Sequence, residues 1–303
     1  MKRKDGLFKN IKQHYQLYLI FLPVLLYFAI FCYGPMYGIQ IAFRDYYPGM
    51  RYTEADWVGF SNFLRFFRSY QFKPVLINTL SISLLNLILG LPLPIILALI
   101  LNEIRYTKLK KTLQTISYAP HFISTVAMAG LILTFTSERG LLNQIITSLG
   151  GNAVSFMSEP RMFKWVYVIS HVWQGAGWGS IIYIAALSSV DTSLYEAAEI
   201  DGAGRLQKIW NVDLPCILPT IVIMLILNCG KIMSIGYEQI LMLQNDLNKS
   251  ASQIISTYTY EIGLLQYDYS YSTAIGLFNS IINLILLVSV NWFSRKVTET
   301  SLW

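Results

Sequence analysis

Six runs without Asp, Glu, Lys or Arg recur along the chain, and apolar residues dominate each of them. Five runs hold at least 26 residues, whereas the run that starts at Leu214 holds 17 before Lys231 closes it. A helix that crosses about 30 Å of hydrocarbon needs about 20 mostly apolar residues. The pattern therefore predicts six transmembrane helices, in the runs 13–43, 74–102, 112–137, 165–190, 214–230 and 269–294.

Three features modify this pattern. The stretch 140–158 also lacks charge, but its Asn, Gln, Ser, Thr and Gly residues are too polar for lipid, so we expect a partly helical loop. Lys231 lies about 16 residues into its helix, near the far interface, where its ammonium can snorkel or face a cavity. Pro92 and Pro94 remove backbone donors inside the second run and predict a kink or break there.

The composition excludes an ordinary soluble globular protein. Hydrophobic residues make up 54% of the 303 residues and charged residues 13%, whereas about a quarter of an average soluble protein is charged. The net charge of +6 is carried by residues that flank the apolar runs, so we expect no nucleic-acid partner. The three cysteines predict neither disulfides nor a metal site. The first run is too long for a usual signal peptide and no A-x-A site follows it, which predicts a retained first span.

The distribution of basic residues predicts the orientation. Six spans place both termini on one side, and the positive-inside rule assigns that side to the cytoplasm. This assignment puts 13 Lys and Arg residues inside, in short segments, and 10 outside. We expect an all-α polytopic membrane protein, N-in and C-in, with a cytoplasmic N-terminal segment 1–14, a six-span transmembrane domain 15–294 and a cytoplasmic tail 295–303.

Aromatic residues are concentrated in two of the predicted outer connections, about residues 36–73 and 237–270. Aromatic side chains gather at membrane interfaces, so an interfacial belt explains them. An outer face that docks a partner or a sugar explains them as well. The sequence leaves both interpretations open.

The fourth connection, about residues 188–214, is acidic although it lies on the predicted cytoplasmic side. It carries five carboxylates and two basic residues. Ser193 and Glu196 have the spacing of a capping box, which predicts a short helix that ends at Gly202. A second short helix is expected over 203–212, and Pro215 then opens the fifth span, where its missing donor has no consequence. The pattern predicts a helix, a turn and a helix on the cytoplasmic surface.

The side chains of this loop favour contact with another protein. Its alanines let another backbone approach closely, and its carboxylates can pair with basic groups of a partner, which suits a helix seated in a groove. An interfacial amphipathic helix without a partner is the alternative. The residues concerned are Glu196, Ala197, Ala198, Glu199, Asp201 and Ala203.

The string Glu196-Ala197-Ala198, three residues, Gly202, nine residues, Val212, one residue and Leu214-Pro215 resembles the EAA motif of the membrane subunits of binding-protein-dependent ABC importers. It departs from the motif only at Val212, where isoleucine is commonest. Flanking strings are similar to the six-span, MalF-like permeases of carbohydrate importers, in detail to the LplB-like polysaccharide or lipo-oligosaccharide branch. They include Gly38-Ile-Gln-Ile-Ala-Phe-Arg-Asp-Tyr and Ala274-Ile-Gly-Leu-Phe-Asn-Ser.

This resemblance implies a type I ABC importer permease fold, in a bacterial cell membrane, within a complex of several subunits. The implied partners are a second homologous permease, two cytoplasmic ABC ATPase subunits that bind ATP and Mg, and an extracellular solute-binding protein that delivers a carbohydrate. This chain has no GxxxxGK[ST] sequence, so we expect it to bind no cofactor and to be no enzyme. ATP binding by the partners is expected to shift the pathway from inward to outward facing.

The resemblance assigns roles only where the motif matches. The ATPase contact is expected at Glu196, Ala197, Ala198, Asp201, Gly202 and Ala203, and Leu214 and Pro215 form the structural end of the loop. Polar and aromatic residues of the fourth and fifth spans are candidates for the substrate pathway, because sugar sites combine aromatic stacking with amides and charges. They are His171, Trp173, Gln174, Trp178, Asn228, Lys231, Tyr237 and Glu238.

Three other functions stay open from the sequence. Importers of peptides or other polar solutes share the EAA motif. A secondary transporter needs buried ionisable residues for ion coupling, whereas the apolar runs contain no charge and Lys231 only closes the fifth. A membrane enzyme is disfavoured because His14, His121 and His171 have no HExxH or Ser/Asp partner at a recognised spacing.

Overall fold

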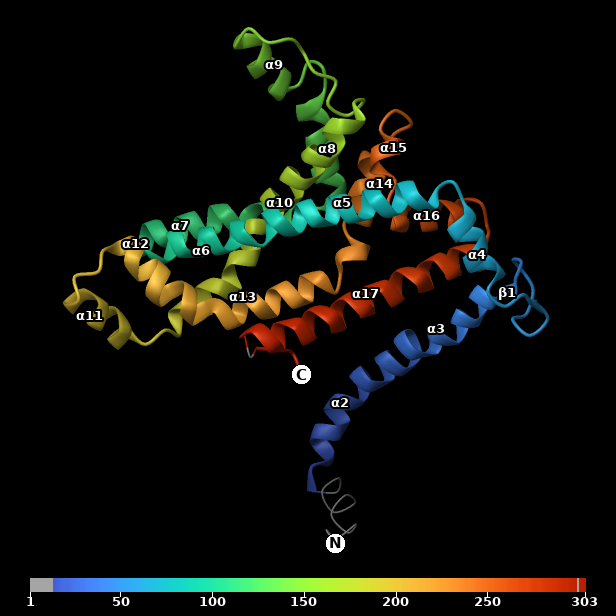
Figure 1. The fold of residues 1–303 in the computed structure, drawn as a ribbon, viewed down its shortest axis with the longest axis horizontal. Helices are drawn as coiled ribbons and strands as arrows, with labels where there is room; N and C mark the ends of the chain where they lie inside the picture. Colours follow the sequence, from blue (N-terminus) through green and yellow to red (C-terminus); the bar gives the residue numbers. More distant parts are fainter. Residues whose placement is uncertain (1–12, 299) are drawn as a thin grey trace.

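The computed structural model describes residues 13–298 and 300–303, and it is mostly helical. The described part of the chain starts with a rod of consecutive helical segments that spans Tyr15–Phe43. Its first helix projects away from the other helices (Figure 1) and buries no residue, whereas its last segment contacts α17 (Tyr269–Thr298). Its segments are α2 (Tyr15–Tyr27), the π-helix η1 (Phe28–Tyr33), α3 (Gly34–Met36) and the 3-10 helix η2 (Tyr37–Phe43).

Two short strands and a short helix connect the rod to the body. Strands β1 (Arg44–Asp45) and β2 (Asp56–Trp57) pair antiparallel, with Arg44 opposite Trp57. Helix α4 (Ser61–Arg68) follows, and it buries Phe63 and Phe66.

Helices α5 to α10 form one half of the body (Figure 1). The longest of them is α10, which contacts α5, α6, α7 and α13 and therefore lies among most of the long helices. The segments are α5 (Phe72–Gly90), α6 (Pro92–Asn102), α7 (Thr107–Tyr118), the 3-10 helix η3 (Ala119–Phe122), α8 (Thr125–Thr136), α9 (Leu141–Ser148) and α10 (Pro160–Ser188).

The second half of the chain packs on the first. Helices α13 and α17 lie against each other, and α13 also contacts α10. The segments are α11 (Thr192–Ile200), α12 (Arg205–Lys208), the π-helix η4 (Ile209–Asp213), α13 (Leu214–Cys229), the 3-10 helix η5 (Ile232–Ser234), α14 (Tyr237–Leu243), α15 (Lys249–Ser252), α16 (Ile255–Tyr260), the π-helix η6 (Glu261–Leu265) and α17 (Tyr269–Thr298).

Apolar clusters hold these helices in place. One cluster joins α5, α8, α10 and α14 around Ile82, Tyr167 and Ile240, and another joins α6, α10 and α13 around Leu99 and Ile217. Burial of apolar side chains away from both lipid and water fixes the helix contacts through close packing.

One glycine sets the approach of two helices. A Cβ atom added to Gly177 of α10 would lie 1.9 Å from the carbonyl oxygen of Ser117 in α7. The two backbones therefore touch at a point where no side chain fits.

By length and composition, four helical segments of the described chain can cross a membrane, and a fifth is added if a bent pair counts as one span. The four are Tyr15–Phe43, Phe72–Asn102, Arg205–Cys229 and Tyr269–Thr298. The expected continuous helix over 112–137 is wrong, because the chain bends by 97° between Thr107–Phe122 and Thr125–Ser148. Six spans and the N-in, C-in orientation stay predictions.

Helix α10 covers the fourth predicted run and is 29 residues long, but it is not among the four apolar segments. Polar side chains lower the mean hydropathy of α10, and several of them contact other parts of the protein. His171 meets Gln239 at 3.2 Å, and Gln174 Nε2 donates to the Ile123 carbonyl at 2.9 Å.

The predicted break at the second run is minor. The segment Phe72–Asn102 continues as one span, and the helix is interrupted only at Leu91. Pro92 and Pro94 lie in the first turn of α6, where a missing donor removes little. The stretch 140–158 is partly helical as expected, because α9 occupies Leu141–Ser148.

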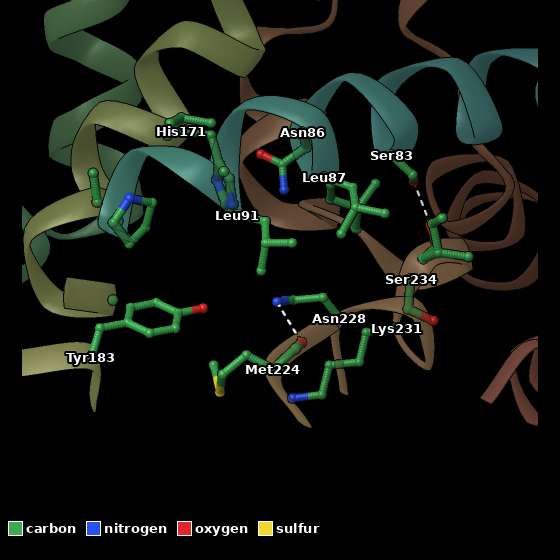
Figure 2. A pocket seen from close by; sticks show the side chains of 18 residues that line it. Ser83, Asn86, Leu87, Leu91, His171, Tyr183, Met224, Asn228, Lys231 and Ser234 are labelled. Atoms are coloured by element: carbon green, nitrogen blue, oxygen red, sulfur yellow. Dashed lines mark hydrogen bonds between the residues drawn. The ribbon is translucent and has the colours of Figure 1, made fainter. Parts of the chain in front are cut away.

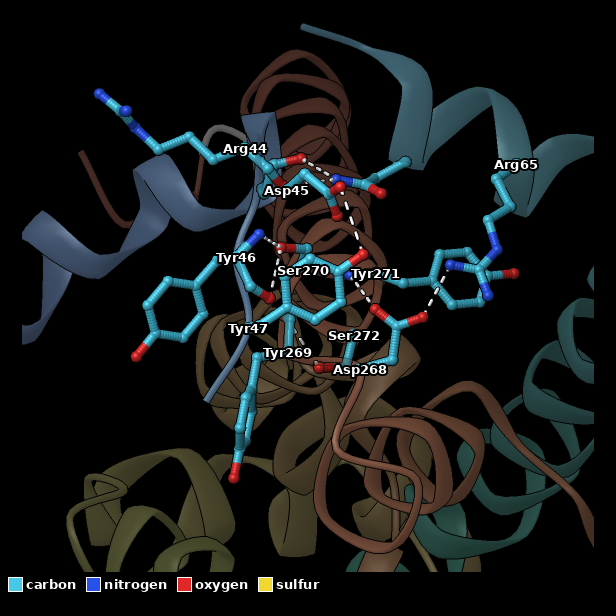
Figure 3. Close-up of polar contacts among 12 residues, drawn as sticks. Arg44, Asp45, Tyr46, Tyr47, Arg65, Asp268, Tyr269, Ser270, Tyr271 and Ser272 are labelled. Carbon is cyan, nitrogen blue, oxygen red and sulfur yellow. Dashed lines mark hydrogen bonds and ion pairs between the residues drawn. The ribbon is translucent and has the colours of Figure 1, made fainter. Parts of the chain in front are cut away.

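The aromatic segment 36–73 packs on itself and on α17, and Figure 3 shows its polar contacts with the start of α17. Phe43 stacks on Trp57 at 5.6 Å between ring centroids, and the Tyr46 amide donates to Ser270 Oγ at 2.8 Å. Arg65 pairs with Asp268 at 2.7 Å and lies over the Tyr271 ring at 4.2 Å. These contacts tie the end of the N-terminal rod to the start of α17.

Candidate functional site

The acidic loop begins with a well-defined short helix. Helix α11 starts after Asp191, whose Oδ1 accepts a hydrogen bond from the Ser193 amide at 2.9 Å. The expected capping box at Ser193 and Glu196 is therefore wrong. The N-cap lies two residues earlier, because the Asp191 carboxylate accepts the hydrogen bond from a free backbone amide of the first turn. The same hydrogen bond holds the pKa of Asp191 below its usual value.

The predicted turn at Gly202 is confirmed. Gly202 has φ of +76°, and its amide donates to the Glu199 carbonyl at 3.0 Å, while the Ala203 amide donates to Ala198 at 2.8 Å. This pair of bonds is a Schellman motif, in which the left-handed position favours glycine.

The expected separate second helix over 203–212 is wrong. Helix α12, the π-helix η4 and α13 form one continuous helix over Arg205–Cys229. Leu214 and Pro215 consequently lie inside this helix rather than at its start. The π-helix precedes Pro215, and the wider turn lets the chain continue past the missing proline donor.

Side-chain bonds tie α11 to this continuous helix. The Tyr195 hydroxyl donates to Oδ1 of Asp213, which is buried. Burial and then the Asp213 carboxylate raise the pKa of Tyr195. Lys208 pairs with Glu199 at 2.5 Å, and this contact lowers the pKa of Glu199. Both bonds and the Gly202 turn connect α11 to the continuous helix that contains α13.

The outward face of the loop carries unpartnered apolar side chains next to carboxylates. Ile200 is 87% exposed, Leu206 72% and Trp210 69%. The sequence predictions missed these three residues, although large apolar residues within a charged loop are a readable signal. Glu196, Ala197, Asp201 and Gly202 are exposed beside them, and Ala198 and Ala203 are half-buried. This face has the composition of a docking surface.

A second candidate site is a cavity of about 350 Å³ between α5, α10 and the end of α13 (Figure 2). Its volume lies at the lower end of the range for ligand pockets, about 300–1,000 Å³. Figure 2 shows the Tyr183 hydroxyl and the Asn228 amide directed into the same space from opposite sides. Gly90, Gly175 and Gly179 leave the space unfilled.

The structure brings together three of the eight predicted pathway residues. His171, Asn228 and Lys231 line the cavity. Asn228 and Lys231 are exposed in the isolated chain, whereas His171 is half-buried.

The other five residues lie elsewhere. Trp173 lines a separate apolar groove, and Trp178 stacks on His121 at 4.5 Å between ring centroids. Gln174 is engaged by the Ile123 carbonyl. Tyr237 lies 5.7 Å from the Tyr260 ring, and Glu238 is exposed on α14.

Four polar lining residues were missed by the sequence predictions. They are Ser83, Asn86, Tyr183 and Ser234. Ser83 and Asn86 lie in the second run, where a few small polar residues among many apolar ones gave no periodic signal. Asn86 Oδ1 is buried and accepts no hydrogen bond from the residues that the structure describes.

The comparisons with known proteins identify similar transport proteins over most of the chain. A family model described as the binding-protein-dependent transport system inner membrane component matches residues 90–299. Protein LplB of Bacillus subtilis is 42% identical over 97% of this chain and 92% of its own length. The polygalacturonan/rhamnogalacturonan transport system permease protein YteP of the same organism is 43% identical over 100% of this chain and 94% of its own.

A solved structure matches as well. A chain of a bacterial alginate ABC transporter, crystallised in complex with an alginate pentasaccharide-bound periplasmic protein, superposes with a TM-score of 0.90. It is 40% identical, and the match covers 98% of this chain and 99% of that one.

Proposed function

The chain belongs to the family of binding-protein-dependent transport system inner membrane components, and on this premise we propose that it and a second permease form the pathway for ATP-driven uptake of an oligosaccharide or polysaccharide fragment. It is a permease subunit of an ABC importer and not an enzyme. The relatives that share its sequence and fold belong to the same class of transporter subunits. The new elements of the proposal are the substrate, the coupling contact and the topology.

The substrate assignment is supported by the relatives. Two of them are named for glycan polymers, polygalacturonan/rhamnogalacturonan and alginate. A second transporter structure with a TM-score of 0.89 is described as importing the acidic polysaccharide alginate. A glycan is therefore favoured over a peptide.

The same relatives support one of the proposed partners directly. The matched transporter was crystallised with a periplasmic protein, which supports a solute-binding protein as a partner of this permease. We propose two ATPase subunits on the cytoplasmic side, which bind the ATP and Mg. In this arrangement the membrane is that of a bacterial cell, the chain crosses it six times, and the segments 1–14 and 295–303 face the cytoplasm. Residues 1–12 lie outside the described part of the chain.

One observation carries the coupling proposal: an exposed helix is joined to a membrane helix through a short hydrogen-bonded turn. Helix α11 presents Ile200 and the carboxylates of Glu196 and Asp201, and the Gly202 turn leads into the helix Arg205–Cys229. Ala197, Ala198 and Ala203 allow close approach of the ATPase. Closure of the ATPase dimer pushes on α11, and α13 carries the movement to the cavity, which shifts the population between two packings.

The test is co-purification with the ATPase. The tagged chain is co-expressed with its partners and purified in mild detergent, as wild type, as Gly202→Asp and as Gly204→Asp. Gly202 holds a left-handed φ of +76°, whereas Gly204 has φ of −72° and tolerates a side chain. Both variants add the same charge to the same turn, so Gly204→Asp is the matched control.

We expect the ATPase to co-elute with the wild type and with Gly204→Asp, and to be lost or uncoupled in Gly202→Asp. Equal retention of coupled ATPase activity in both variants contradicts the proposed contact. Absence of any ATPase from the wild-type complex contradicts the importer assignment.

A further inference from the structure

The cavity contains a single charged side chain in an otherwise uncharged lining. Among the described residues that line it, none is Asp or Glu, and Lys231 is the one Lys or Arg. Lys231 lies two residues past the end of α13, and its amide donates to the Asn228 carbonyl at 3.1 Å. The negative end of that helix favours a cation at this position.

No carboxylate of the described residues lies within 4.0 Å of the Lys231 ammonium. All four ion pairs found in the described chain involve other residues. A charged side chain within a transmembrane region is expensive and is paired or functional when it is retained. The Lys231 ammonium therefore has no anionic partner among the described residues and is available to an anion from outside them.

The neutral groups around Lys231 are those that bind sugar hydroxyls. Asn86 Oδ1 is a buried acceptor without a donor, and the Tyr183 hydroxyl points into the space. Asn228 Nδ2 donates to the Met224 carbonyl at 2.8 Å, which leaves its Oδ1 as an acceptor. The lining thus offers hydrogen-bond acceptors and donors for sugar hydroxyls beside one cation.

We infer that this cavity is a binding site for a uronate unit of the glycan, in which the Lys231 ammonium binds the carboxylate and Asn86, Tyr183 and Asn228 bind hydroxyls. The inference rests on the proposed function, because it presumes that a glycan passes this cavity. An ammonium and a carboxylate form a charge-assisted hydrogen bond, which is about twice as strong as a neutral one. The site thereby selects acidic glycans over neutral glycans of the same shape.

The test measures glycan binding to the complete permease and ATPase complex in detergent, without the solute-binding protein. The probes are trigalacturonate and the neutral trisaccharide obtained by reducing its carboxyl groups. The variants are Lys231→Gln, Lys231→Arg and, as a control, Lys73→Gln. Lys73 is an exposed residue of α5 that does not line the cavity, so its loss removes the same charge elsewhere.

We expect Lys231→Gln to raise the Kd for trigalacturonate about tenfold, with Lys231→Arg and Lys73→Gln within about twofold of the wild type. The reduced trisaccharide is expected to bind the wild type about tenfold more weakly than trigalacturonate does. Lys231→Gln should leave the Kd for the reduced trisaccharide at its wild-type value.

Three results overturn the inference: equal binding of both probes by the wild type, equal weakening of both by Lys231→Gln, or no binding of either. In all three cases the proposed importer function stands if the ATPase still co-elutes. A lower thermal midpoint of Lys231→Gln in the absence of glycan indicates instead that Lys231 pairs with a carboxylate of the second permease, which also overturns the inference.

Discussion

The acidic loop and the cavity are built in opposite ways. The loop is one continuous segment, about residues 190–215, whose turn is set by the local sequence around Gly202. The cavity is lined by α5, α10 and the end of α13, whose residues lie up to 152 positions apart, from Ser83 to Ile235. Local chemistry therefore determines the first site, and long-range helix packing determines the second.

The two regions also differ in burial. No residue of α11 is buried, and its large aliphatic side chains, Leu194 and Ile200, are exposed. Around the cavity, Ser83 and Val172 are buried, and Tyr183 is only 2% exposed. The loop keeps most of its side chains exposed, whereas the cavity depends on the stability of the helices around it. Substitutions in the loop and substitutions around the cavity should therefore have different effects.

The largest effect is expected where the helices behind the cavity touch. Gly177→Ala places a Cβ atom 1.9 Å from the Ser117 carbonyl oxygen, so α10 and α7 must move apart. Overpacking of this kind costs about 3 kcal/mol. We expect a lower thermal midpoint of the purified chain and loss of glycan binding.

Gly175→Ala on the same helix is the control, because a Cβ atom there has no neighbour within 4 Å. Its thermal midpoint should stay unchanged or rise, since alanine favours a helix over glycine. An unchanged midpoint in Gly177→Ala contradicts the close approach of the two helices.

An intermediate effect is expected where the loop is tied to α13. Tyr195→Phe removes the hydroxyl that donates to Asp213, and the buried carboxylate loses this donor. A lost bond of this kind costs about 1–2 kcal/mol. We expect ATP hydrolysis to become less dependent on the liganded binding protein, while glycan binding by the permease complex stays at the wild-type level.

Tyr106→Phe is the matched control, because Tyr106 lies before α7 and is 79% exposed. The stimulation of ATP hydrolysis should stay at the wild-type level in this variant. Weaker glycan binding in Tyr195→Phe, with normal stimulation, would place the role of Tyr195 in the cavity rather than in coupling.

The smallest effect concerns the ion pair of Glu199 and Lys208. Lys208 lowers the pKa of Glu199, so the pair stabilises the folded loop above the ordinary pKa of Glu and this contribution is lost as the pH falls through the lowered value. The thermal midpoints of wild type and Glu199→Gln should differ slightly at pH 7 and converge toward pH 4. High salt should reduce the difference, because the pair is exposed. A difference that grows on acidification contradicts the sign of this shift.

The contrast also explains what the sequence could predict. The turn at Gly202 was predicted because its determinants lie within a few residues. The start of α11 was misplaced because Asp191 and Ser193 are both suitable caps, and only the folded geometry selects one. The second helix was not recognised as part of the fifth span, since Pro215 is a common helix start and the π-helix before it leaves no sequence signal.

The cavity was predicted less completely for a physical reason. Lys231 and His171 are conspicuous in apolar helices, so the sequence singled them out. Asn86 and Tyr183 resemble many other residues of membrane helices, and only packing shows that they face the cavity. Trp173 and Trp178 were chosen by residue type, but they lie on other faces of α10.

The central claim is that the acidic loop couples ATP hydrolysis to transport and that the cavity binds the glycan. Its most direct test compares Gly202→Asp and Lys231→Gln in proteoliposomes that contain the complete transporter, with uptake of trigalacturonate, ATP hydrolysis and glycan binding measured on the same preparations. The account predicts that Gly202→Asp loses coupled hydrolysis and uptake but binds the glycan with the wild-type Kd. It predicts that Lys231→Gln keeps its ATPase subunits and binds the glycan about tenfold more weakly. Loss of glycan binding in Gly202→Asp, or release of the ATPase subunits by Lys231→Gln, would contradict it.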